Sequence, residues 1–492
     1  MNQKKPILII CDELEAPTGV GIQAFTLCQH LIATDKYRFI NLAAFPPDEF
    51  KRRRPPVKIY RPGQDDKKIS DGWVEAGKAG ITVENAVANE DVVIMPCEGF
   101  AHPQYLANVV QLIRKTYQDT LHIIFVSDPR FYANFWPIIE AVRKQKCKMH
   151  YWHVWDNGPT PFFNKYILRA ADTVMSISKN THEGLELVAA TMHGEEHSQL
   201  VYAPHAYNEH GPFVPLNLDK TGIDQIRRKW FKTTFPEKFV LFWDNKNFWR
   251  KLPGQLLFAF AVAKQTMPHL ALVLKTNAVP FVQQEAGQDL IECAVRMGLK
   301  LGEDIVFVDN NTLSNEQMNQ LYNATDCTIN IAHSEGFGLS TLCAMMAGRP
   351  IIATATGGMR TQLGLPTIYD PEGKGPGRHE DHVQSVEHGV AIWPNNRHII
   401  GSPPAPYIWE EHCHIEDIAA AMVRVVERSQ EEGAYFKMCK AARAFALDNF
   451  SIHTLAEKFI DVLNDDQPWQ RSLVKVVDPL KSSQGMIDLE MR

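Results

Sequence analysis

Residues 333–350 read HSEGFGLSTLCAMMAGRP. The stretch places Glu335 and two glycines, Gly336 and Gly338, directly after the apolar segment CTINIA (327–332) and before an apolar, helix-like run. Glycine lets the backbone come close to a ligand. The N–H groups at a helix start, with the positive end of the helix dipole, suit a phosphate. The stretch therefore predicts either a plain strand–helix turn or a site that holds a diphosphate.

The composition is that of an ordinary globular protein. The chain has 492 residues, of which 45% are hydrophobic and 22% charged, and its net charge is −6. This length predicts two or three domains, and the net charge means that binding to a polyanion needs a local basic patch. Because no apolar stretch reaches about 18 residues, no membrane span is expected. Nine scattered cysteines without a CxxC pair favour a reducing, cytoplasmic location.

Short apolar runs alternate with helix-like segments in two series. The first series is PILIIC (6–11), YRFINLAAF (37–45), DVVIMP (91–96), LHIIFVSD (121–128), MHYWHVWD (149–156), TVMSIS (173–178) and LVYAP (200–204). The second series is FVLFWD (239–244), ALVLKT (271–276), DIVFVD (304–309), CTINIA (327–332) and PIIATA (350–355). Strands that alternate with helices indicate parallel sheets covered on both faces. We expect an α/β fold of two doubly wound domains that face a cleft.

Several stretches, in order along the chain, resemble a known family. They are SISKNT (176–181), VYAPHAYNEHGPFVP (201–215), NKNFWRKLPGQLLFAF (245–260), LSNEQMNQLYNATD (313–326), the EGFGLxxLxAMxxGxP pattern (335–350) and ATATGG (353–358). The sequence resembles the retaining nucleotide-sugar glycosyltransferases of the GT-B fold, in the large group called family four or group one. The likeness is dense in the second half of the chain and thin in the first 120 residues. A looser likeness is to phage-encoded members, which would work in the host cytoplasm.

The resemblance implies how the chain is divided. Residues 1–210 would form a Rossmann-like domain that binds the acceptor, and residues 211–435 a Rossmann-like domain that binds the nucleotide sugar. Helices in 436–466 would cross back to the first domain, and 467–492 would be a polar tail. Residues 365–411, with many Pro, Gly and His, are expected to be loop-rich. The oligomeric state is left open.

The resemblance also implies which residues bind the donor, a UDP- or GDP-sugar. Glu335 would contact the hydroxyls of the sugar, and Arg250 and Lys251 would hold the diphosphate, because cations stabilise the charge that develops on the leaving group. A solvated carboxylate and a surface charge pair are the alternatives. The remaining donor candidates are Gly19, Gly21, Asn247, Lys275, Gly336, Phe337, Gly338, Leu339 and Cys343. No cluster with metal-ligand spacing is found, so no metal is expected.

Cys343 departs from the family pattern. Relatives usually have a second glutamate eight positions after the first, where it holds the ribose hydroxyls. A thiol is a weak hydrogen-bonding group, so the residue that recognises the ribose is left open. This departure keeps a non-catalytic sugar-nucleotide-binding protein as an alternative.

In the first domain, HYWHVWDN places His153 and Asp156 in a stretch that faces the sugar in relatives. His153 would assist the acceptor hydroxyl or hold a sugar hydroxyl, with a buried structural histidine as the alternative. With Glu335, Arg250 and Lys251, these two residues complete the catalytic candidates. Because no carboxylate nucleophile is evident, retention implies front-face attack, in which the leaving phosphate takes the proton of the acceptor.

The segment FPPDEFKRRRPPVKIYR (45–61) is expected to be a basic loop after the second strand, facing the cleft. From Lys51 to Arg61 it has six basic residues and no acidic one, which suits a polyanionic acceptor. The acceptor candidates are Arg52, Arg53, Arg54 and, from another strand end, Asp128. Hydroxymethylated pyrimidine in phage DNA is slightly favoured over an anionic lipid or a cell-surface polysaccharide precursor. A solvated charge run is the structural alternative.

Overall fold

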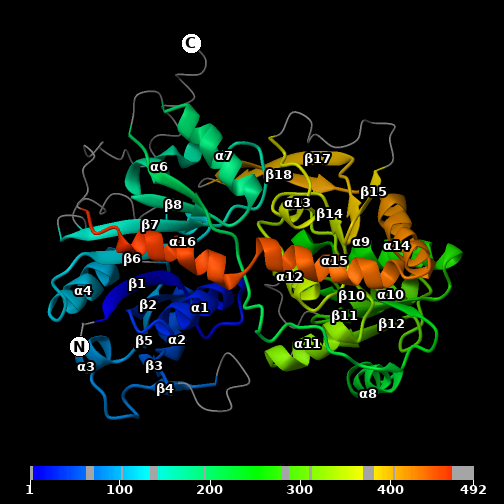
Figure 1. The fold of residues 1–492 in the computed structure, drawn as a ribbon, viewed down its shortest axis with the longest axis horizontal. Helices are drawn as coiled ribbons and strands as arrows, with labels where there is room; N and C mark the ends of the chain where they lie inside the picture. The colour runs from blue at the N-terminus through cyan, green and yellow to red at the C-terminus, as the bar shows by residue number, and fades with distance from the viewer. Residues whose placement is uncertain are drawn as a thin grey trace.

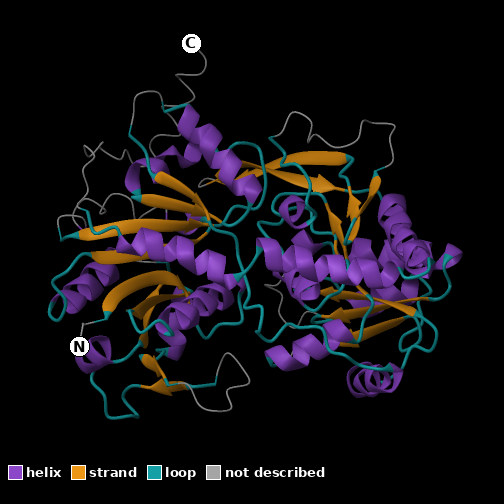
Figure 2. Cartoon of the chain, in the orientation of Figure 1, coloured by secondary structure: helices purple, strands orange, loops and turns teal. Residues whose placement is uncertain are grey.

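The computed structural model shows two lobes, each built around one sheet with helices on its faces (Figures 1 and 2). The structure describes residues 4–61, 71–100, 103–132, 142, 145–192, 196–279, 287–309, 313–369, 382–402 and 405–467. The predicted polar tail, 467–492, lies outside these residues except for Gln467. The predicted α/β fold with two mainly parallel sheets is confirmed.

The first lobe holds a nine-stranded sheet in the order β4-β3-β5-β2-β1-β6-β7-β8-β9. Its strands are β1 Lys5–Asp12, β2 Tyr37–Phe45, β3 Lys58–Tyr60, β4 Trp73–Glu75, β5 Val92–Glu98, β6 Leu121–Ser127, β7 Cys147–His153, β8 Thr173–Ser176 and β9 Gln199–Tyr202. Every run of the first predicted series contains a strand. The sequence reading missed β3 and β4, an antiparallel pair at the edge, because three-residue strands carry almost no periodic signal.

The second lobe holds a seven-stranded sheet in the order β12-β11-β10-β13-β14-β16-β15 and a separate hairpin, β17-β18. The strands are β10 Phe239–Asp244, β11 Leu270–Lys275, β12 Ile305–Val308, β13 Cys327–Asn330, β14 Ile351–Thr354, β15 Val383–Val386, β16 Gly389–Ile392, β17 Asn396–Ser402 and β18 Ala405–His412. All five predicted strands of this series are present. The expectation that 365–411 is loop-rich is wrong for the described part of this segment, which holds β15, β16, β17 and all of β18 except His412.

Helices flank the sheets and connect the strands. They are α1 Gly19–Ile32, α2 Pro47–Arg53, α3 Val83–Asn89, α4 Pro103–Arg114, α6 Lys165–Ala170, α7 Lys179–Ala190, α8 Lys220–Phe231, α9 Pro253–Thr266, α10 Leu290–Arg296, α11 Asn315–Asn323, α12 Leu339–Met346, α13 Met359–Gln362, α14 Ile415–Gln430, α15 Ala434–Asn449 and α16 Ile452–Asn464. None of the helices within the described residues has the length and apolar character of a membrane span.

The basic segment 45–61 is not a simple loop, which corrects the expectation. Its first part forms α2, with Pro47 at the first helical position, Asp48 and Glu49 in the first turn and basic residues in the last turn. Proline is preorganised for a helix start, and these charges match the helix dipole at both ends. The basic run therefore stabilises a short helix.

The chain crosses between the lobes twice, and the two crossings are hydrogen-bonded to each other. Tyr207 N–H donates to Phe450 O at 3.2 Å, and Ile452 N–H donates to Tyr207 O at 3.1 Å. After the second crossing, α16 lies along the first lobe (Figure 1). Its Phe459 is fully buried, with its ring centroid 5.1 Å from that of Trp152 on β7. Helix α16 is thus packed against the first lobe, which also contains β1.

Replacing Phe459 with alanine tests how firmly α16 holds the first lobe. The lost contacts and the cavity that remains should lower the free energy of unfolding by about 3–5 kcal/mol. Phe436→Ala on α15 is the matched control, because that ring is 73% exposed and its loss should cost less than about 0.5 kcal/mol. Calorimetric unfolding midpoints measure both. Equal shifts for the two variants would contradict the packing role of α16.

Candidate functional site

Two glycine turns lie against each other at the carboxyl edge of the second-lobe sheet. The first follows β13 and leads into α12, whose preceding residue, Gly338, has φ 94° and caps the helix with no side chain. The second follows β14, and there Gly358 N–H donates to Glu335 O at 2.8 Å. A Cβ added to Gly358 would lie 1.9 Å from Gly336 O. The turns therefore approach so closely that only glycine is accommodated.

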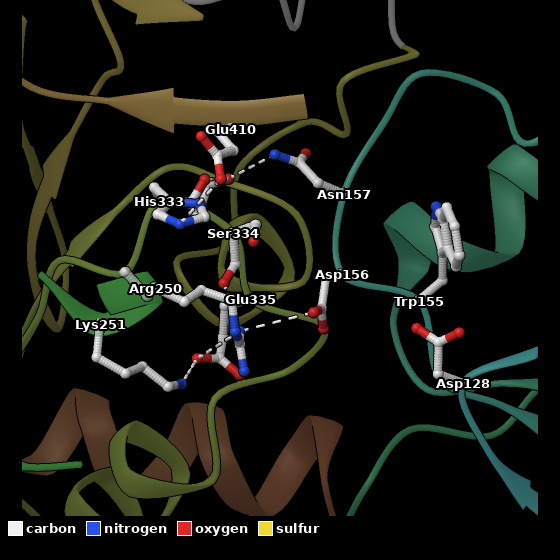
Figure 3. A network of polar contacts seen from close by, with 12 residues as sticks. Asp128, Trp155, Asp156, Asn157, Arg250, Lys251, His333, Ser334, Glu335 and Glu410 are labelled. Carbon is white, nitrogen blue, oxygen red and sulfur yellow. Dashed lines mark hydrogen bonds and ion pairs between the residues drawn. The ribbon is translucent and has the colours of Figure 1, made fainter. Parts of the chain in front are cut away.

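Three predicted donor residues meet at the first turn. Lys251 Nζ donates to Glu335 Oε2, and Arg250 lies 3.8 Å from the same oxygen. Arg250 also donates to Ser334 O at 2.6 Å, which fixes its side chain along the turn (Figure 3). Burial lowers the pKa of Lys251, although Glu335 acts to raise it. The structure thus brings Arg250, Lys251 and Glu335 into one network.

Asp156 extends to this network from the first lobe (Figure 3). Its carboxylate lies 3.7 Å from Arg250 and next to Gly336, where an added Cβ would be 3.0 Å from Asp156 Oδ1. Burial acts to raise the pKa of Asp156, but Arg250, Lys251 and Arg130 outweigh it, so the pKa lies below its ordinary value. Asp156 is therefore an ionised group that couples the two lobes at the site.

Arg130 is a cation of the same network that the sequence reading missed. It follows β6 and binds Asp128 through two contacts, at 2.9 and 2.6 Å. Burial raises the pKa of Asp128, and Arg130 opposes that rise. Arg130 also interacts electrostatically with Asp156 and Arg250. The sequence feature that could have indicated Arg130 is its position two residues after Asp128, directly after a buried strand.

His153 lies apart from the ion-pair network. The side chain is fully buried, its Nε2 is 3.4 Å from Asn164 Nδ2, and its ring is next to those of Tyr151 and Trp155. Burial lowers its pKa to about 3, so the imidazole is neutral at physiological pH. These contacts are all within the first lobe, and the catalytic role of His153 stays a prediction.

Of the glycines that open α1, one faces the other lobe. A Cβ at Gly19 would lie 3.3 Å from Leu339 Cδ1, so the starts of α1 and α12 meet. A Cβ at Gly21 would instead meet carbonyl oxygens of its own loop at 2.8 Å. Asn247 donates to two backbone carbonyls of neighbouring segments, at 3.0 and 2.7 Å. Gly19 lies between the lobes, whereas Gly21 and Asn247 support local structure.

The remaining donor candidates are Phe337 before α12, Cys343 within α12 and Lys275 at the end of β11. The ring of Phe337 is buried against His205, with centroids 5.3 Å apart, so only its backbone can contact a ligand. Lys275 pairs with Asp244 at 3.4 Å. Cys343 is 5% exposed, and burial raises its pKa well above the ordinary value of a thiol. Cys343 is therefore a neutral thiol.

The hairpin β17-β18 joins the second lobe to the first beside the site. Asn157 donates to Thr356 Oγ1 at 3.0 Å and to Glu411 Oε2 at 3.1 Å. The Glu411 side chain is fully buried, and the Trp409 N–H donates to Gly158 O at 2.6 Å. Sequence reasoning missed these residues because it predicted the hairpin region to be loop.

The basic segment presents less free charge than its sequence indicates. Four of its cations lie next to carboxylates. These pairs are Lys51–Glu98 at 3.1 Å, Arg53–Glu49 at 2.8 Å, Lys58–Glu13 at 2.9 Å and Arg61–Glu90 at 2.8 Å. Arg52 and Arg54 are exposed. In the described part of the chain, no group of three His, Cys, Asp or Glu residues could hold a metal ion.

The sequence and the fold are similar to those of known proteins. Residues 265–370 match the family model described as glycosyl transferases group 1. A crystal structure of HepE from Anabaena with UDP and glucose is similar at 14% identity and a TM-score of 0.58, covering 93% of this chain and 99% of that one. Sucrose-phosphate synthase from Thermosynechococcus elongatus is similar at 15% and 0.57, covering 94% and 98%. Trehalose-6-phosphate synthase OtsA is similar at 11% and 0.60, covering 95% and 100%.

No curated protein matches the sequence. At these identities the likeness to solved structures shows the fold, which is GT-B. The matched segment runs through β13, the Glu335 turn and α12. The chain thus has the GT-B fold, and its residues 265–370 are similar to glycosyl transferases of group 1.

Buried neutral histidines should make the protein acid-sensitive. Burial lowers the pKa of His122 to about 4, and those of His153, His205 and His333 to about 3. An unfolded histidine titrates near 6.5, so between these values the unfolded state binds more protons. The contribution of these histidines to the free energy of unfolding is therefore fully present above about pH 6.5. As the pH is lowered below that value, each histidine reduces the free energy of unfolding by up to about 1.4 kcal/mol per pH unit.

Unfolding midpoints at pH 7.5 and pH 5.0 measure this loss. His153→Gln should reduce the drop between the two pH values, whereas His210→Gln, at a side chain 86% exposed, should leave it unchanged. An equal drop in the wild-type protein, His153→Gln and His210→Gln would contradict this prediction. It would show that His153 is already protonated in the folded state at pH 5.0.

Proposed function

We propose that the protein transfers a sugar from a UDP-sugar, or else a GDP-sugar, to a hydroxyl acceptor with retention of configuration. The single observation that carries this proposal is the group of Arg250, Lys251 and Glu335 at the start of α12. It combines cations for a diphosphate with a carboxylate for sugar hydroxyls. The likeness to a protein solved with UDP and glucose supports UDP as the nucleotide.

Charge explains how this site would act on the donor. Arg250 and Lys251 lie next to the start of α12, where the dipole favours an anion. As the sugar leaves, the nucleoside diphosphate gains negative charge, and fixed cations stabilise it without reorganising. Glu335 keeps Lys251 in place and offers its carboxylate to the sugar.

Retention in this proposal follows a front-face path. Asp156 and Glu335 are each held by cations of the network, so we assign them to binding and orientation and not to covalent attack. The acceptor hydroxyl attacks from the side of the leaving diphosphate and gives its proton to a phosphate oxygen. The site supplies position and electrostatics. Because the cations supply the positive charge, we propose that no metal is required, and full activity in EDTA would agree with this.

For the acceptor, we propose a polyanion, with hydroxymethylated pyrimidine in DNA ahead of an anionic lipid or a polysaccharide precursor. Exposed Arg52 and Arg54 support this choice. The paired cations nearby weaken it, although exposed pairs such as Lys51–Glu98 are held by only about 0–1 kcal/mol. DNA phosphates could compete for them. The proposed location is the cytoplasm, or the host cytoplasm for a phage-encoded protein.

Lys251→Ala and Glu335→Gln test the donor site. Each should lower the slow hydrolysis of the preferred nucleotide sugar by about 100-fold or more, because fixed groups that stabilise developing charge contribute at this level. Arg296→Ala, at a side chain 80% exposed on α10, is the control and should keep full activity. Release of UDP or GDP from a panel of donors is the measurement. Absence of binding and turnover with every donor would favour a non-catalytic role.

The acceptor is tested by mass spectrometry of hydroxymethylcytosine DNA after incubation with mixed donors. We expect a mass increase of one sugar per modified base. The combined Arg52→Ala, Arg53→Ala and Arg54→Ala changes should reduce transfer about tenfold, as loss of several phosphate contacts does, without altering donor hydrolysis. Anionic vesicles in a parallel salt series test the lipid alternative. Unchanged binding to both surfaces in the triple variant would eliminate the basic segment as the acceptor site.

A further inference from the structure

A second polar cluster lies at the carboxyl edge of the second-lobe sheet, beside the start of α12. Asp244 ends β10 and Lys275 ends the neighbouring β11, with Nζ and Oδ1 3.4 Å apart. Tyr322 of α11 donates its hydroxyl to Asp244 Oδ2 at 2.8 Å. Cys343 of α12 and Tyr207 of the first crossing also interact with Asp244. Side chains from four other segments thus interact with one carboxylate.

The Asp244 carboxylate is oriented but still accessible. Its side chain is 18% exposed, and that of Lys275 is 16% exposed. An ionised carboxylate offers about four acceptor positions, and the two contacts described above use two of them. The Asp244 carboxylate is therefore partly exposed and can accept further hydrogen bonds.

The distance along α12 from the donor turn to the cluster suits the spacing between the diphosphate and the ribose of one nucleotide. Leu339 and Cys343 are four residues apart on α12 and so share one face of that helix. Along the axis they are separated by about 6 Å. The diphosphate proposed above lies at the first of these residues, and the ribose is joined to the diphosphate through its 5′ oxygen. One helical turn further along, the ribose would lie beside Asp244.

Building on the proposed function, we propose that Asp244 recognises the ribose of the donor by accepting hydrogen bonds from its 2′- and 3′-hydroxyls. Two adjacent hydroxyls match the two oxygens of one carboxylate. Lys275 pairs with that carboxylate at 3.4 Å, and Tyr322 orients it. In this protein the carboxylate comes from β10, since Cys343 has only a weakly hydrogen-bonding thiol. Asp244 is thus a residue that selects ribose over deoxyribose.

Calorimetric titration of the full chain with UDP and with 2′-deoxy-UDP tests the proposal, with GDP and 2′-deoxy-GDP in parallel. The wild-type protein should bind the ribonucleotide about tenfold or more tightly than its deoxy analogue, as expected for loss of a hydrogen bond to a charged group. In Asp244→Asn the preference should fall to about twofold or less. Binding of UDP should weaken more than binding of 2′-deoxy-UDP, because UDP loses two hydrogen bonds to the carboxylate and the deoxy analogue loses only that of its 3′-hydroxyl.

Two further variants separate recognition from general damage. Tyr322→Phe keeps the ring but removes the hydroxyl that orients Asp244, and it should reduce the preference for ribose partially. Asp448→Asn, at an exposed position on α15, should change nothing. If Asp244→Asn binds UDP and keeps the wild-type preference, the inference is wrong while the proposed function stands. If the wild-type protein binds neither nucleotide pair, the proposed function itself fails.

Discussion

The close contact between the two glycine turns is the constraint on which the site depends. Gly357 and Gly358 lie against the backbone of Asp156, Glu335 and Gly336 at distances that leave no space for a side chain. This contact fixes the backbone that carries Glu335. Because backbone atoms define the contact, it tolerates little movement. The ion pairs are then built on a rigid base, which a preorganised site requires.

The charges of the network balance before any ligand is present. Asp128, Asp156 and Glu335 face the cations Arg130, Arg250 and Lys251. Buried charges are stable when they are paired in this way. The diphosphate that we propose as ligand would add negative charge to this balanced group, and the start of α12 would then supply further positive potential. The network explains how so polar a cleft stays folded and how an anion can still be accommodated.

The sequence predicted the sheets well because their strands are continuous apolar runs between turns. It failed where structure depends on partners distant in the chain. The hairpin β17-β18 is rich in polar residues, and it is held by Glu411 and Trp409 through contacts with Asn157 and Gly158. No local sequence pattern predicts such contacts. The charge of the basic segment was also overestimated, because Glu13, Glu90 and Glu98 pair with it from other elements.

The sequence by itself determined the α/β class, the order of the strands in each series and the glycine turn with Glu335, Arg250 and Lys251. These features follow from local periodicity and from short motifs. Only the tertiary structure decided that Arg130 joins the ion pairs around the predicted residue Asp156, that His153 stays apart from them, and that Asp244 interacts with Cys343. Those outcomes depend on how two sheets from distant parts of the chain face each other. The spacing of residues along the chain does not predict which side chains of the two lobes lie close together.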